Sequence, residues 1–223
     1  MTQKNPKYCE LSAIYWGWKN LKNVEYAGLA HYRRYFDIDI NDDNVDELMK
    51  GYDMMVVKRM KTFYFAFNKG GLTYATSQDD FWLCLDTLLY MRPEYKSEII
   101  DYFCNNNGYT PYTMFLAKKE IYDDYCEFMF PVFFELEKRI PEHPYSRQNR
   151  LIAYFGEWTL GLYIHCKKLK VKRVPNVMLG PECNHTPVEK FSALKLAFKN
   201  LVYYIKYTKV LLFRKKDRLY LPD

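Results

Sequence analysis

Residues 24–36, VEYAGLAHYRRYF, decide the fold that we expect for this chain. The first seven of them are mostly apolar and carry no charge after Glu25, which is typical of a short buried strand. The strand then ends in His31, Tyr32, Arg33 and Arg34. Because ligands of open α/β sheets bind beyond the carboxyl ends of strands, this stretch predicts such a sheet and a site at its edge.

Working outward, the apolar pattern alternates between the period of a strand and the period of a helix. Further strands are predicted over residues 52–57, 112–117 and 169–174. Helices are predicted over residues 8–21, 43–49, 77–91, 95–104, 118–139 and 146–167, with a loop over 61–76. Strands that alternate with helices indicate a layered α/β fold with a largely parallel or mixed sheet.

The distribution of charge divides the chain into two parts. The net charge is +6, and residues 189–223 alone carry nine basic and three acidic side chains, so the remainder is balanced. We therefore expect a main domain over 1–188 and a basic tail over 189–223. A balanced body argues against nucleic acid as a partner, although 18% of the chain is aromatic.

Two further features concern the cellular location. The chain has no run of about 18 apolar residues, so no spanning helix is predicted. Its six cysteines form no C-x-x-C pair, which favours small buried thiols in a reducing cytoplasm over a zinc site.

The basic tail has the pattern of an amphipathic helix. Lys195, Lys199, Lys206 and Lys209 fall within about 80° of one another on a helical wheel, and aromatic and aliphatic residues surround them. This pattern predicts that residues 190–218 lie on an anionic membrane surface. The alternative is a helix that packs on the main domain and leaves its lysines in solvent.

A resemblance to a bacterial family rests on long, specific blocks. Residues 4–20, KNPKYCELSAIYWGWKN, and 26–36 closely resemble the family catalogued as domain of unknown function 4422. The resemblance continues at 115–127, FLAKKEIYDDYCE, and extends to about residue 175. That family looks like glycosyltransferases of capsular and exopolysaccharide synthesis, and some members are described as galactofuranosyltransferases.

The resemblance implies a GT-A-like, Rossmann-like fold with a mixed sheet, followed by the basic amphipathic helix. It also implies a hexosyltransferase at the cytoplasmic side of the inner membrane. Such an enzyme moves a sugar from a nucleotide sugar, expected to be UDP-linked, to a lipid-linked glycan of capsule, exopolysaccharide or O-antigen. Family members begin with an additional strand of the nucleotide-binding sheet. The alternative is therefore a degenerate, non-catalytic relative that binds a membrane or partner enzymes through its tail.

The donor's diphosphate needs positive charge as it leaves. Arg33 and Arg34, with His31, are the predicted diphosphate contacts, and His31 is also a candidate acid or base. Tyr32 is a predicted donor contact that could stack on the base or the sugar. The alternative is that both arginines pair with surface carboxylates.

A bound metal ion could also neutralise the negative charge of the leaving diphosphate. Asp37 and Asp39 have the D-x-D spacing that holds Mn²⁺ or Mg²⁺ in many glycosyltransferases, and the alternative for them is a solvated loop.

Glu157 is the predicted catalytic base. Helical spacing places it on one face with Ala153, Leu160 and Gly161, and a glycine inside a helix indicates that something approaches closely. A carboxylate buried there would have a raised pKa, as a base needs. The alternative is a buried ion pair with Arg150.

Asn5 and Glu10 lie in the block of strongest resemblance. We predict that both contact the donor, with Glu10 hydrogen-bonded to a sugar or ribose hydroxyl. The alternative for Glu10 is a helix cap.

Overall fold

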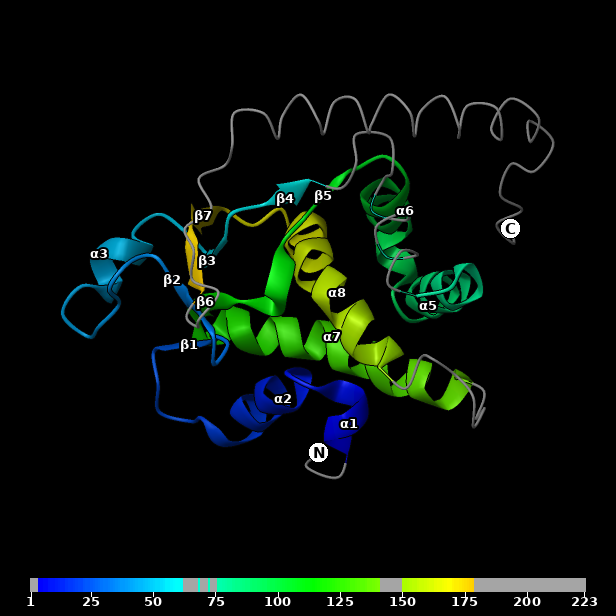
Figure 1. Ribbon diagram of the computed structural model, residues 1–223, viewed down its shortest axis with the longest axis horizontal. Helices are drawn as coiled ribbons and strands as arrows, with labels where there is room; N and C mark the ends of the chain where they lie inside the picture. Colours follow the sequence, from blue (N-terminus) through cyan, green and yellow to red (C-terminus); the bar gives the residue numbers. More distant parts are fainter. Residues whose placement is uncertain (1–3, 62–67, 69–71, 73–75, 141–149, 179–223) are drawn as a thin grey trace.

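The computed structural model describes residues 4–61, 68, 72, 76–140 and 150–178 (Figure 1). The basic tail and most of the predicted loop over 61–76 lie outside the described residues. The amphipathic helix and the division of the chain at residue 188 therefore stay predictions.

A four-stranded mixed sheet organises the described part of the molecule. Its strand order is β1 (Tyr26–Leu29), β6 (Phe115–Lys118), β3 (Met54–Val57) and β7 (Val171–Val174). Strand β6 is antiparallel to both of its neighbours, whereas β3 and β7 are parallel. The carboxyl ends of β1, β3 and β7 consequently meet at one edge, where β6 begins. The prediction of an α/β fold with a mixed sheet is confirmed.

Helices cover one face of this sheet with a large core. Helices α7 (Lys119–Arg139) and α8 (Leu151–Lys167) cross at the centre of Figure 1. Against them pack α1 (Asn5–Tyr8), α2 (Leu11–Asn20), α5 (Gln78–Met91) and α6 (Lys96–Cys104). The opposite face is covered by α3 (Val45–Met49), where a smaller cluster holds Met49, Met55 and Val174.

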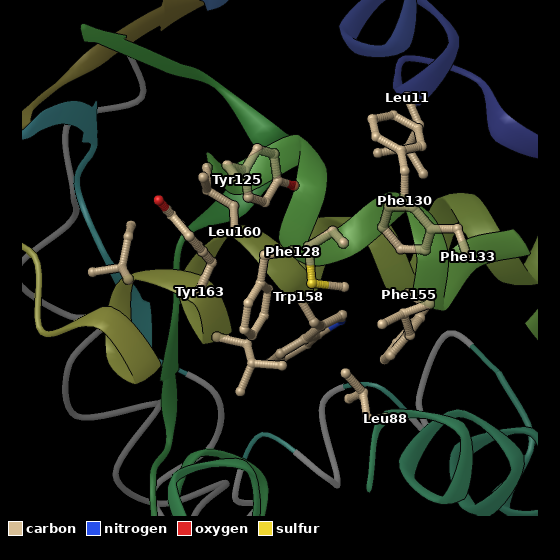
Figure 2. Packing of buried hydrophobic residues seen from close by; sticks show 14 of the residues in the cluster. Leu11, Leu88, Tyr125, Phe128, Phe130, Phe133, Phe155, Trp158, Leu160 and Tyr163 are labelled. Carbon is tan, nitrogen blue, oxygen red and sulfur yellow. The ribbon is translucent and has the colours of Figure 1, made fainter. Parts of the chain in front are cut away.

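Aromatic side chains fill the large core, which accounts for the unusual composition. Figure 2 shows Tyr125, Phe128, Phe130, Phe133 and Phe155 within this cluster. Their rings meet mostly edge to face, the arrangement that aromatic quadrupoles prefer. The core thus fixes α7 and α8, the two helices that lie closest to the site described below.

Local sequence features account for several details of these elements. Ser77 caps α5 with a complete capping box, in which its hydroxyl accepts from the Asp80 N–H and the Asp80 carboxylate accepts from the Ser77 N–H. Pro131 lies inside α7, which continues through it. All four residues of β3 are buried, and their side chains alternate between the two faces of the sheet, since Met54 and Val56 lie in the large core and Met55 in the small one.

The single helix predicted over residues 8–21 is wrong. The chain breaks at Cys9, whose φ of 47° lies in the left-handed region, and this break separates α1 from α2. A periodic apolar pattern runs through such a break without a gap. The turn therefore leaves no mark on the helical spacing.

Two short ribbons were not predicted. One pairs β2 (Arg34–Phe36) with β8 (Asn176–Met178), and the other pairs β4 (Met60–Lys61) with β5 (Gly108–Tyr109). The strand predicted from residue 112 starts at Phe115, because a 3₁₀ turn occupies Pro111–Thr113. Both ribbons lie beyond the ends of the central strands and so help to build the site.

Candidate functional site

The edge of the sheet at which β1, β3 and β7 end gathers polar side chains from distant parts of the chain. His31 follows β1, Arg59 follows β3, and Tyr112 and Thr113 precede β6. The sequence analysis expected ligands at such an edge, and the topology brings these residues to it.

His31, Arg34 and Tyr112 form one connected group at this edge. His31 Nε2 donates a hydrogen bond to the carbonyl oxygen of Tyr112, so this nitrogen carries the proton. The guanidinium carbon of Arg34 lies 4.2 Å from the centre of the Tyr112 ring, a cation–π contact. A tight turn joins the two basic residues, with the Arg34 N–H 3.2 Å from the His31 carbonyl oxygen.

The backbone at Tyr112 and Thr113 is strained. Their φ angles are 68° and 53°, in the left-handed region that residues with side chains seldom adopt. Two consecutive residues in this conformation cost on the order of 1–2 kcal/mol each. Such strain persists where the surrounding structure imposes it, and it gathers at binding and catalytic sites.

Glu157 lies half-buried on α8, close to this group. Burial and, to a lesser extent, the Glu10 carboxylate raise the pKa of its carboxyl, the Arg34 guanidinium opposes the rise, and the net result is a pKa of about 7. The three side chains therefore share one electrostatic environment. A carboxyl with a pKa near neutrality can both accept and release a proton under physiological conditions.

The alternative in which Glu157 pairs with Arg150 is not what the structure shows. In the described part of the chain, Glu157 has no ion-pair partner, and Arg150 instead acts on the Cys9 thiol. Burial raises the pKa of that thiol, and Arg150 opposes the rise. Glu157 is thus a half-buried carboxylate that forms no ion pair with a described residue, and the Arg34 charge only partly offsets the effect of burial on its pKa.

The predicted close approach to the α8 glycines is confirmed. A Cβ atom built on Gly156 would lie 2.7 Å from Leu11 Cδ1, and one on Gly161 would collide with the hydroxyl oxygen of Tyr102. Beside Glu157, the Trp158 ring stacks on Tyr109 with centroids 4.2 Å apart. The glycines let Leu11 of α2 and Tyr102 of α6 approach α8 closely.

Two buried polar atoms at this edge lack partners. The Nε of Arg34 and the Oγ1 of Thr113 form no hydrogen bond to any described residue. Buried polar atoms are nearly always paired, so an unpaired group in a native structure calls for an explanation. A polar ligand bound at this edge would supply one.

The other predicted donor contacts lie apart from this group. Arg33 and Tyr32 are exposed and contact each other, with the guanidinium carbon 5.0 Å from the ring centre. Asn5 is exposed at the start of α1, where its carbonyl oxygen accepts a hydrogen bond from Cys9. Neither Arg33 nor Arg34 forms an ion pair with a described carboxylate, so the surface-pair alternative is not seen.

Asp37 and Asp39 lie exposed after β2. The Asp39 carboxylate accepts a hydrogen bond of 3.1 Å from the Asn41 side chain, and the Asp37 N–H donates to the Pro175 carbonyl. Across the described ranges, no group of three histidine, cysteine or carboxylate side chains could hold a metal ion. A metal-binding role for this pair stays a prediction that lacks a third described ligand.

Tyr109, Tyr112, Thr113, Arg59 and Arg173 were not predicted to be site residues. The rule that ligands bind beyond strand ends, applied to the strand predicted over 52–57, would have found Arg59. No comparable signal marks Tyr112, because its importance arises from its backbone conformation.

Comparison with known proteins identifies the family. The family model described as "Domain of unknown function (DUF4422)" matches residues 1–168. The chain belongs to this family. The DUF4422 family that the first block resembled is therefore confirmed, over a range slightly shorter than the resemblance suggested.

The DUF4422 chain is also similar to a solved structure. The apo structure of the bifunctional glycosyltransferase WbbM aligns with a TM-score of 0.73 and 24% sequence identity. The alignment covers 81% of this chain and 38% of the WbbM chain. At this identity the likeness shows that the two share a fold. A search of curated proteins found no match to the DUF4422 chain.

The described helices were also compared with the length and hydropathy of membrane spans. None of those within residues 4–178 that the structure describes is long and apolar enough to cross a bilayer.

Proposed function

We propose that this DUF4422 protein is a glycosyltransferase that moves a sugar from a nucleotide sugar to a lipid-linked glycan. The observation that carries the proposal is Glu157, a half-buried carboxyl with a pKa raised to about 7 that lies near Arg34 at the ligand-binding edge of the sheet. A base and a cation placed together are what sugar transfer from a diphosphate requires. The fold shared with WbbM supports the same activity.

Glu157 serves as the general base of an inverting transfer. Its carboxylate accepts the proton of the acceptor hydroxyl while the hydroxyl oxygen bonds to the anomeric carbon. The bond between that carbon and the donor's phosphate oxygen breaks, and the diphosphate leaves with the electron pair. A base is most effective when its pKa lies near the working pH, which the burial of Glu157 provides.

Arg34 and His31 meet the charge that develops on the leaving diphosphate. The unpaired Nε–H of Arg34 is already desolvated, so it gains a hydrogen bond when an anion arrives. The Tyr112 carbonyl and ring hold both side chains in place before the ligand binds. Glu10, beside Glu157, is placed to accept a hydrogen bond from a sugar hydroxyl.

We derive no step through a metal ion. Asp37 and Asp39 are exposed, and no third ligand lies with them among the residues the structure describes. A metal held there would neutralise the same leaving group that Arg34 meets.

Further parts of the proposal come from the resemblance to the family and from the charge pattern of the tail. The donor is UDP-linked and the sugar a hexose, with galactofuranose the first to test. The glycan belongs to capsule, exopolysaccharide or O-antigen, and the protein works in the cytoplasm at the inner membrane. The basic residues of 190–218 attach the main domain to that anionic surface.

The test is a panel of nucleotides and nucleotide sugars, measured by thermal shift and then by transfer to a lipid-linked acceptor. A ligand at one hundred times its Kd stabilises the fold by about 2.7 kcal/mol, which such an assay detects. Stabilisation by one class of nucleotide sugar, followed by transfer of its sugar, is the expected result. A chain that no nucleotide stabilises, but that binds anionic vesicles, would instead be the non-catalytic relative.

A further inference from the structure

Two arginines on adjacent strands lie at the carboxyl edge of the sheet, beyond the group around Glu157. Arg59 follows β3 by two residues, and Arg173 lies in β7 opposite Val56 of β3. Because β3 and β7 are parallel, their carboxyl ends adjoin. The proposed transfer step gives neither arginine a role.

The side chain of Arg59 is held in a fixed position. Its Nη2 donates to the Gly108 carbonyl over 3.1 Å and to the side-chain oxygen of Asn106. A Cβ atom on Gly108 would collide with the guanidinium of Arg59, so the glycine leaves the space that this group fills. These described hydrogen bonds use one nitrogen of the guanidinium, which has five N–H donors in all.

The two positive charges act on each other without a described counter-ion. Partial burial lowers the pKa of Arg173, and the charge of Arg59 lowers it further. Within the described ranges, no carboxylate forms an ion pair with either arginine. Two neighbouring guanidiniums repel each other, and a bound anion would replace that repulsion with charge-assisted hydrogen bonds.

The charges of both arginines also act on a buried hydroxyl, that of Tyr102 in α6, which packs against Gly161 of α8. The Tyr102 side chain is 2% exposed, and its hydroxyl oxygen has no hydrogen-bond partner among the described residues. Burial raises the pKa of this phenol, while Arg59 and Arg173 oppose the rise, so both charges reach it. The hydroxyl is therefore a desolvated donor close to two cations.

We propose that Arg59, Arg173 and the Tyr102 hydroxyl bind a diphosphate group. Guanidinium forks match phosphoryl oxygens in shape and charge, and two of them match two linked phosphoryl groups. The site deepens the proposed function and rests on it for the molecule that carries the diphosphate. That molecule is either the nucleotide of the donor or a prenyl diphosphate of the acceptor lipid.

The test is titration calorimetry of the full chain with inorganic pyrophosphate, uridine diphosphate and geranyl diphosphate. The variants are Arg173→Gln and Arg59→Gln, with Lys172→Gln as the matched control. Lys172 adjoins Arg173 in β7, but its ammonium donates to the Leu48 carbonyl over 2.8 Å, beside α3 on the other face. Thermal unfolding verifies that each variant folds, and Arg173→Gln is the safer one because Arg59 makes hydrogen bonds to Asn106 and Gly108 that its variant loses.

Loss of one charge-assisted contact should weaken pyrophosphate binding by about 10- to 100-fold in each arginine variant and leave the control unchanged. A matching loss for uridine diphosphate identifies the donor as the carrier, and a matching loss for geranyl diphosphate identifies the lipid. The proposal is overturned if wild type binds none of the three, if both arginine variants bind as wild type does, or if Lys172→Gln loses as much.

These outcomes are separate from the fate of the transferase. If pyrophosphate binding falls in Arg173→Gln while wild type transfers no sugar, the diphosphate site stands and the enzyme assignment is wrong. If wild type transfers sugar while both arginine variants bind all three ligands normally, the site is wrong and the enzyme assignment stands.

Discussion

Buried polar side chains behave differently in the helical layer and at the carboxyl edge of the sheet. In the helical layer the hydroxyls of Tyr122 and Tyr163 donate to the Ile14 carbonyl and the Asp124 carboxylate, each over 2.7 Å. At the edge, Arg34 Nε, Tyr102 Oη and Thr113 Oγ1 have no partner among the described residues. Two further buried atoms, Ser12 Oγ in α2 and Asn68 Oδ1, also have no partner among the described residues, so unpaired atoms are concentrated near this edge but not confined to it. Such a concentration is expected of a site that binds a polar ligand.

The helical layer and the sheet edge also differ in the placement of charges and in backbone conformation. Glu157 lies near Glu10, and Arg59 lies near Arg173, so like charges adjoin at the edge. Tyr112 and Thr113 hold left-handed backbone there, whereas α7 runs regularly for 21 residues. Each of these features costs stability, and the core has to offset the cost.

The largest effect is expected for Glu157→Gln, which keeps the shape of the side chain and removes its basicity. Turnover should fall by about 10²- to 10⁴-fold, the usual contribution of a general base, while donor affinity changes little. Steady-state kinetics with the sugar donor identified by the nucleotide panel measures both.

Glu127→Gln is the matched control, because Glu127 is an exposed carboxylate on neighbouring α7. Turnover in Glu157→Gln equal to that of this control would remove the base role from Glu157.

A substitution in the core should affect stability, whereas Glu157→Gln should affect turnover. Phe155 is fully buried two residues before Glu157, and its ring meets Phe133 at 85° with centroids 6.2 Å apart. Phe155→Ala should lower the free energy of unfolding by about 3–5 kcal/mol, because truncation leaves a cavity. Urea denaturation measures the loss.

Trp16→Ala, which truncates a side chain that is 59% exposed, should cost about 1 kcal/mol or less. An equal loss in the two variants would show that Phe155 is not part of a rigid core.

The raised pKa of Glu157 makes stability depend on pH. The carboxyl titrates at about 7 in the folded state and near 4.5 when unfolded, so its contribution is largest below pH 4.5 and is lost as pH rises to 7. Glu157→Gln should therefore match wild type near pH 4 and exceed its free energy of unfolding by up to about 3 kcal/mol at pH 8.

Urea titrations at several pH values measure this difference. A difference that stays constant between pH 4 and pH 8 would mean that the carboxyl is not perturbed by burial. If Glu157→Gln gains stability and loses turnover, then Glu157, like the unpaired polar atoms at the sheet edge, destabilises the free protein and serves its function.

Local signals predicted much of the fold. Caps, apolar periods and strand ends act over a few residues, so the Ser77 capping box, the four central strands and the long helix through Pro131 could all be predicted from the sequence. The break at Cys9 could not be predicted, because the apolar period continues through it. The ribbon of β2 with β8 could not be predicted either, because it pairs residues about 140 positions apart along the chain.

The candidate site divides in the same way. Glu157 could be found because glycines on its own helix indicate burial, and Arg34 could be found because it follows a strand. Arg33 has the same sequence signal as Arg34, yet it is exposed on Tyr32 while Arg34 lies over Tyr112. Adjacent residues point differently once β2 pairs with β8, and no spacing rule contains that information.

The smallest changes in stability are expected for two tyrosines that are each replaced by phenylalanine, one in the core and one near the sheet edge. These two variants test the comparison between core and edge most directly. Tyr122→Phe removes the hydrogen bond to the Ile14 carbonyl and should lower the free energy of unfolding by about 1 kcal/mol. Tyr102→Phe removes a buried hydroxyl that has no described partner, so it should be neutral or stabilising by about 1 kcal/mol.

Denaturant titrations without ligand compare the stability of the two variants, and titration with pyrophosphate then compares their affinity for the ligand. Under the diphosphate proposal, Tyr102→Phe loses affinity for pyrophosphate and Tyr122→Phe does not. Equal destabilisation of the two without ligand would show that the Tyr102 hydroxyl is already satisfied, and the contrast between core and edge would fail at that residue. If Tyr122→Phe lowers the free energy of unfolding and Tyr102→Phe raises it, the Tyr102 hydroxyl destabilises the ligand-free protein, and only a bound ligand would supply its hydrogen bond.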